Sequence, residues 1–120
     1  MVRKYNKGAR AERELCKKLD KLGFAVIRAA GSGGSISTPD IVGIKKGRVL
    51  AFECKAWKTT PRLGKKEYEN FKEWCLMSGA MGFLAWKNKG WKFLGLKDIP
   101  NTSIKKNGLS FKDLMFVINV

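Results

Sequence analysis

Residues 39–55 read PDIVGIKKGRVLAFECK, and they are the most informative segment of the sequence for the fold. It contains two short apolar runs rich in β-branched and aromatic residues, which predict strands over 40–44 and 48–55. The intervening residues Lys45-Lys46-Gly47 predict a tight turn. We therefore expect the two strands to be neighbours in one sheet.

The predicted strand pair carries two carboxylates in costly positions. Asp40 opens the first strand directly after Pro39, and Glu53 lies inside the apolar second strand. A buried carboxylate is unfavourable unless it is paired or binds a metal. Because side chains alternate along a strand, Glu53 shares a face with Lys55, so an ion pair between these two is one interpretation. Asp40 and Glu53 are expected to converge at one end of the sheet.

The segments on both sides of this pair predict one α/β domain over residues 1–120. Helices alternating with short strands imply a sandwich around a central mixed sheet. Working outward, the chain reads as a helix over 8–22, a strand over 24–29, a Gly/Ser loop over 31–38, a cationic loop over 58–64, a helix over 65–78, strands over 82–86 and 91–96, and a short last helix capped by Ser110.

The first predicted helix supplies a third carboxylate. Its apolar face consists of Gly8, Ala11, Leu15, Leu19 and Leu22. Glu12 falls at the edge of this stripe and faces the core, whereas Arg13 and Glu14 face outward. Glu12, Asp40 and Glu53 together suit a hard divalent cation, because Mg²⁺ takes oxygen ligands. Such a site supports phosphodiester hydrolysis without histidine, which the chain lacks.

Charge and cysteine content narrow the function classes further. The chain has 25 Lys and Arg against 10 Asp and Glu, a formal net charge of +15, which favours nucleic acid as the partner. The three cysteines are far apart, and with no histidine a His/Cys metal site is excluded. A reducing, cytoplasmic setting is expected. No apolar run is long enough to cross a membrane.

Several segments together resemble a known family. Pro39-Asp40 followed by Glu53-Cys54-Lys55 matches the PD-(D/E)xK nuclease signature. The segments 7–15 (KGARAEREL) and 23–29 (GFAVIRA), with the Ser32 loop after them, are more specific. Over residues 3–100 the chain resembles the archaeal Holliday junction resolvases. The resemblance implies a restriction-endonuclease-like fold and a homodimer that cuts four-way DNA junctions by paired symmetric nicks, in recombination and repair.

The resemblance also implies roles for the residues of the site. Asp40, Glu53 and the main-chain carbonyl of Cys54 would hold Mg²⁺, for which Mn²⁺ would substitute. Glu12 would complete the site directly or through a water, and Lys55 would be the catalytic lysine.

The same resemblance implies the surfaces that meet DNA. Arg13 and Arg28 would contact phosphates, and Ser32 would lie on a loop that closes over the scissile strand. Arg28 also stands at a strand end beside the Gly-rich loop, which suits a phosphate contact. The basic loop over 57–66 is expected to face DNA as well, through Lys58, Arg62, Lys65 and Lys66.

Other interpretations stay open at this point. Glu53 and Lys55 would form a plain ion pair if Asp40 were only a turn residue. The same metal site would also serve a PD-(D/E)xK nuclease that acts on other DNA structures. A non-catalytic, basic architectural DNA-binding protein would explain the charge, although it has no use for inward carboxylates.

Overall fold

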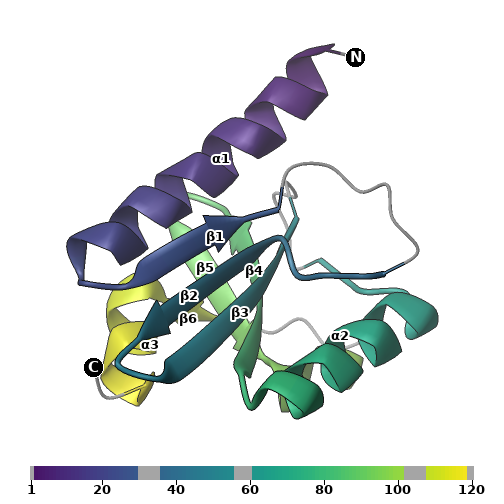
Figure 1. Cartoon of the computed structure of the whole chain (residues 1–120). Coiled ribbons are helices and arrows are strands. Elements are labelled where there is room, and N and C mark those ends of the chain that lie inside the picture. Colours follow the sequence, from purple (N-terminus) through teal and green to yellow (C-terminus); the bar gives the residue numbers. More distant parts are fainter. Residues whose placement is uncertain (1, 30–35, 56–60, 102–107, 119–120) are drawn as a thin grey trace.

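The computed structural model describes residues 2–29, 36–55, 61–101 and 108–118. Its helices are α1 (Val2–Lys21), α2 (Lys65–Ser78), α3 (Phe111–Ile118) and the 3-10 helix η1 (Leu96–Asn101). Its strands are β1 (Ala25–Arg28), β2 (Ile41–Lys45), β3 (Arg48–Lys55), β4 (Met81–Lys87), β5 (Trp91–Gly95) and β6 (Leu109–Ser110). These strands form one sheet in chain order (Figure 1).

The sheet is mixed, as the sequence predicts. Strands β3 and β4 run parallel and are connected through α2, whereas every other neighbouring pair is antiparallel. The hairpin of β2 and β3 turns at Lys46 and Gly47, whose φ angles are 50° and 83°. Positive φ at both central residues is typical of the tight turns that suit the twist of a hairpin.

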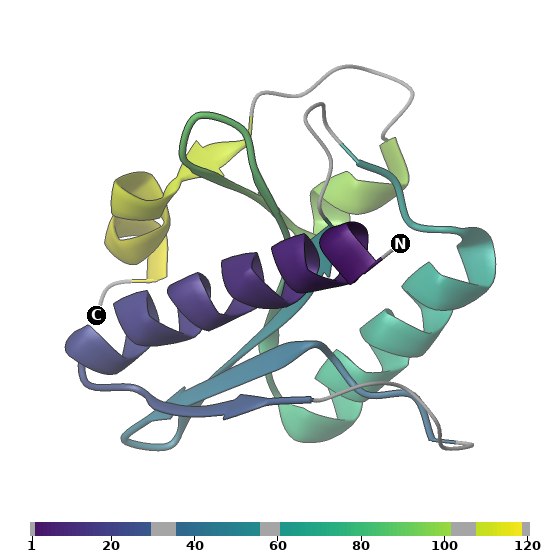
Figure 2. The same cartoon turned by 90° about the horizontal axis from the view of Figure 1, so that it is seen from above.

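Helices cover both faces of the sheet. Leu50 and Phe52 of β3 face one core with α1 and α3, whereas Ala51 faces a second core with α2 and η1. Figure 2 shows the C-terminal end of α1 lying close to α3. Because successive side chains of a strand point to opposite faces, β3 serves both cores at once. The predicted α/β fold class with a central mixed sheet is confirmed.

Most of the apolar face that the sequence predicts for α1 is confirmed. Leu15 and Leu19 are fully buried against the sheet. The helix begins at Val2, earlier than the prediction, and ends before Gly23, which has a φ of 93°. Leu22 departs from the prediction: it lies in the turn after the helix and is 38% exposed.

The later helices agree closely with the sequence. Helix α2 has the predicted bounds, and its Phe71 and Cys75 are buried. Ser110 caps α3, since its hydroxyl oxygen accepts a hydrogen bond of 3.1 Å from the Asp113 N–H. The elements β6 and η1 were not predicted. In the described part of the chain, no helix is long and apolar enough to span a membrane.

Candidate active site

The register of the β2–β3 hairpin brings Asp40 and Glu53 together. The Asp40 N–H lies 3.2 Å from Oε1 of Glu53, and Oδ2 of Asp40 accepts a hydrogen bond of 2.8 Å from the Cys54 N–H. Each carboxylate is therefore fixed by the backbone of the strand that carries the other. The predicted convergence of the two carboxylates at one end of the sheet is confirmed.

The two carboxylates lie in an environment that disfavours their charge. Burial, followed by the charges of Asp40 and Glu67, raises the pKa of Glu53 to about 8. Burial also raises the pKa of Asp40, against the Cys54 N–H and the charge of Lys55, which lower it. Two neighbouring, mostly buried carboxylates are the arrangement that a cation between them would stabilise.

Glu12 reaches the same end of the sheet from α1. Its Oε1 accepts a hydrogen bond of 3.0 Å from Nε of Arg28, the last residue of β1. Burial, followed by the charge of Asp40, raises the pKa of Glu12, so the third predicted carboxylate lies within the electrostatic reach of the pair. Its direct partner is an arginine.

Lys55 forms its ion pair with Glu67. Its Nζ lies 2.8 Å from Oε2 of Glu67, in the first turn of α2. The interpretation of a plain Glu53–Lys55 ion pair is therefore wrong. Glu67 was not singled out from the sequence, because an acidic residue in the first turn of a helix is ordinary. The signal that could have identified Glu67 is topological. Strand β3 is joined to a parallel strand through α2, so the first turn of α2 lies near the end of β3.

The residues at this end of the sheet include oxygen donors that a divalent cation prefers. The carboxylates of Asp40 and Glu53 are such donors, and the main-chain carbonyl of Cys54 is the predicted third. Burial raises the pKa of the Cys54 thiol well above its ordinary value, so the sulfur stays protonated and is a poor ligand. Among the described residues, no three His, Cys, Asp or Glu side chains are grouped so that they could hold a metal ion, so the predicted grouping of Glu12 with Asp40 and Glu53 is not confirmed. Water and a phosphate would supply the other ligands, as is usual for Mg²⁺.

A small pocket adjoins the carboxylates on the α1 side. Its volume is about 30 Å³, and it is lined by Gly8, Ala11, Glu12, Cys54, Lys55 and Trp91. The indole N–H of Trp91 is buried and has no hydrogen-bond partner in the part of the chain that the structure describes. The pocket has room for about one water.

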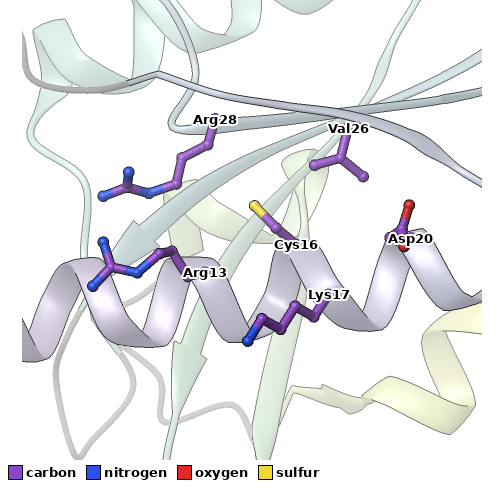
Figure 3. A pocket seen from close by; sticks show the side chains of 6 residues that line it. All are labelled: Arg13, Cys16, Lys17, Asp20, Val26 and Arg28. Carbon is purple, nitrogen blue, oxygen red and sulfur yellow. The ribbon is translucent and has the colours of Figure 1, made fainter.

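A larger and more open pocket of about 410 Å³ lies between α1 and β1 (Figure 3). It is lined by Arg13, Cys16, Lys17, Asp20, Val26 and Arg28. The guanidinium groups of Arg13 and Arg28 extend to the same side of this gap from the helix and the strand. Three cations and one carboxylate, Asp20, line this pocket, and one of the cations, Arg28, is already paired with Glu12. The positive charge that remains makes the pocket suitable for an anion such as a phosphate. Lys17 was not among the predicted contacts.

The other predicted contact residues divide into two groups. Arg62, Lys65 and Lys66 are exposed; Arg62 precedes α2, and the two lysines are its first two residues. Ser32 and Lys58 lie outside the described residues. The roles of both groups stay predictions.

Comparisons with known proteins find similar chains. Residues 3–117 match the family described as archaeal Holliday junction resolvase (hjc). The chain is similar to the crossover junction endodeoxyribonuclease Hjc of Methanocaldococcus jannaschii, with 43% identity over 91 residues. That alignment covers 75% of this chain and 65% of the relative, which is less than two thirds of the relative's length.

Two further relatives are matched over more of their length. The protein of the same name from Sulfolobus acidocaldarius is 32% identical over 123 aligned residues, which cover 91% of this chain and 86% of that protein. The solved structure of Archaeoglobus fulgidus Hjc, described as a Holliday junction resolvase, superposes with a TM-score of 0.78 at 31% identity. The superposition covers 89% of this chain and 98% of the Archaeoglobus fulgidus chain.

Proposed function

Because the chain belongs to the archaeal Holliday junction resolvase family, we propose that it is a metal-dependent endodeoxyribonuclease that resolves four-way DNA junctions by paired symmetric nicks. The predicted family is confirmed by the match over residues 3–117, and the restriction-endonuclease-like fold by the structural neighbour. The observation that carries the proposed chemistry is the convergence of Asp40 and Glu53 at one end of the sheet.

We assign the metal, Mg²⁺ with Mn²⁺ as a substitute, to this pair. Asp40, Glu53 and the main-chain carbonyl of Cys54 would hold it, with Glu12 acting through a water. A bound Mg²⁺ supplies a Lewis acid for the phosphoryl oxygen and lowers the pKa of a bound water. Burial, followed by repulsion from the neighbouring carboxylates, raises the pKa of Glu53 to about 8, and this supports the assignment because a bound cation would offset both effects.

The remaining residues of the site bind and orient the DNA strand. Lys55 lies at the same strand end, where its ammonium can stabilise the charge that develops on the phosphate. Arg13, Lys17 and Arg28 line the larger pocket and would hold a phosphate of the same strand. Contacts of this kind fix the position of the backbone and carry no sequence information, which suits an enzyme that recognises the shape of a junction.

A homodimer completes the proposal. A four-way junction has approximate two-fold symmetry, so a symmetric dimer would present one site to each of two strands of like polarity. We also place the protein in the cytoplasm, which its three free cysteines support.

The test compares a synthetic four-way junction with a linear duplex of the same sequence, with Mg²⁺ or with chelator. We expect paired symmetric cuts in the junction alone, and none in chelator. Equal cutting of both substrates would support a nuclease of other specificity. Tight binding without cutting under either metal would support a non-catalytic DNA-binding protein.

A further inference from the structure

The proposed function gives no role to Glu67, although the carboxylate of this residue contacts Lys55. Glu67 lies on α2, on the opposite side of the sheet from α1, and its Oε2 is 2.8 Å from Nζ of Lys55. The side chain of Lys55 is 25% exposed and that of Glu67 is 39% exposed. The pair therefore sits at the rim of the site, open to an incoming strand.

Lys55 lies in the field of three carboxylates. It follows Glu53 by two positions on the same face of β3, and Oδ2 of Asp40 accepts a hydrogen bond from the N–H of Cys54, the residue between Glu53 and Lys55. The carboxylate of Glu67 lies 2.8 Å from Nζ of Lys55. A lysine without a partner of its own would be drawn toward Asp40 and Glu53. There its ammonium would neutralise the negative charge of the carboxylates that are proposed to bind a divalent cation. The ion pair with Glu67 instead keeps the ammonium beside the carboxylates without a direct contact.

The opposite face of the sheet carries a matching arrangement. Arg28, the cation on the α1 side, is held by Glu12 through a contact of 3.0 Å. Each cation that flanks Asp40 thus has a glutamate from a helix as its partner: Arg28 has Glu12 from α1, and Lys55 has Glu67 from α2. Because an ion pair of the same kind occurs on both faces of the sheet, we favour a role for these pairs in the site over a chance pairing of surface residues.

We propose that Glu67 is a positioning residue of the active site. It holds the ammonium of Lys55 clear of Asp40 and Glu53, so that these carboxylates stay open to a divalent cation and the lysine stays placed for the phosphate. This inference rests on the proposed function for its metal and its substrate. An ordinary surface ion pair would add little to stability and would affect neither metal binding nor cleavage.

The test compares Glu67→Gln with Glu69→Gln. Glu69 is exposed on the same helix, so its substitution makes the same change of charge away from Lys55. Binding of Mn²⁺ to the DNA-free protein is followed through the electron paramagnetic resonance signal of the free ion. We expect Glu67→Gln to weaken Mn²⁺ binding about tenfold, the usual effect of losing a residue that orients a metal site, and Glu69→Gln to leave it nearly unchanged.

Two further measurements isolate the part played by Lys55. In single-turnover cleavage of a bound junction at saturating Mg²⁺, Glu67→Gln should lower the rate, while its junction affinity in chelator should match that of Glu69→Gln. In a Lys55→Met background, Glu67→Gln should weaken Mn²⁺ binding less than in the wild type, because no lysine remains to occupy the carboxylates.

The outcomes separate this inference from the proposed function. Equal Mn²⁺ affinities of Glu67→Gln and Glu69→Gln would overturn the inference, as would an equal effect of Glu67→Gln with and without Lys55. A wild type that binds Mn²⁺ and cuts no junction would contradict the proposed function alone. A wild type that binds no Mn²⁺ would contradict both.

Discussion

Each of the two central carboxylates depends on the backbone of the other's strand. The Cys54 N–H donates to Asp40, and the Asp40 N–H lies within 3.2 Å of Glu53. These contacts fix both side chains in a place where burial opposes their charge, as the raised pKa of each shows. The site therefore holds electrostatic strain that a divalent cation would relieve.

The raised pKa of Glu53 predicts how stability depends on pH without metal. Its folded-state pKa is about 8, against an ordinary value of 4.5. A group whose pKa is raised by folding stabilises the protein below the unfolded-state value, and this contribution is lost as the pH rises through the folded-state value. In chelator, the unfolding temperature of the wild type should therefore fall from pH 4.5 to about 8 relative to that of Glu53→Gln. Circular dichroism melts measure this, and parallel pH curves of the two proteins would contradict it.

Residue by residue, the sequence predicts the centre of the site better than its rim. Asp40, Glu53 and Glu12 stand out because carboxylates are rare on apolar strands and on the inner edge of a helix. Glu67 does not stand out, because its local pattern is that of any acidic residue in a first helical turn. Its proposed role depends on its contact with Lys55, which lies 12 positions earlier in the chain.

Helix α2 brings Glu67 to Lys55 because it packs closely on the sheet. A Cβ atom at Gly82 of β4 would lie 2.6 Å from Sγ of Cys75 and 3.1 Å from the ring of Phe71, so only glycine allows this approach. The bounds of α2 and of the β2–β3 hairpin follow from periodicity and turn residues, which are local signals. The two-residue strand β6 has too few positions to show any period, so the sequence does not predict it.

Substitution of Gly82 tests this packing. Gly82→Ala should destabilise the protein by about 1–3 kcal/mol, because α2 must shift away from β4 to admit the methyl group. Gly95→Ala in β5 is the matched control, since a Cβ atom there meets nothing within 4 Å. Urea unfolding gives the free energy of each variant. Equal stability of the two would show that α2 does not pack as closely as described.

The whole molecule has the charge of a protein that binds a polyanion, with a formal net charge of +15. Composition alone predicts the class of partner, but it does not say where the partner lies. The structure places Arg13, Lys17 and Arg28 around one pocket beside the carboxylates, whereas the turn at Lys46 lies at the other end of the hairpin. Lys17 was missed because one more lysine on a basic helix carries no signal of its own.

The salt dependence of junction binding tests this placement. If Lys17 contacts a phosphate, Lys17→Gln should lower the slope of log Kd against log salt by about 0.9, because one counterion fewer is released. Lys46→Gln removes the same charge at the far end of the hairpin and should change the slope less. Fluorescence anisotropy of a labelled junction in chelator measures both variants. Equal slopes for the two would remove Lys17 from the contact surface.

We propose that Asp40 and Glu53 form the catalytic metal site of a junction-resolving nuclease. The most direct measurement is single-turnover cleavage of a four-way junction by Asp40→Asn, with Mg²⁺ and at protein concentrations that saturate the DNA. We predict that cleavage is abolished while the junction affinity in chelator stays that of the wild type, since the substitution removes a metal ligand and no phosphate contact. Cleavage at the wild-type rate by this variant would show that Asp40 is not a ligand of a catalytic metal.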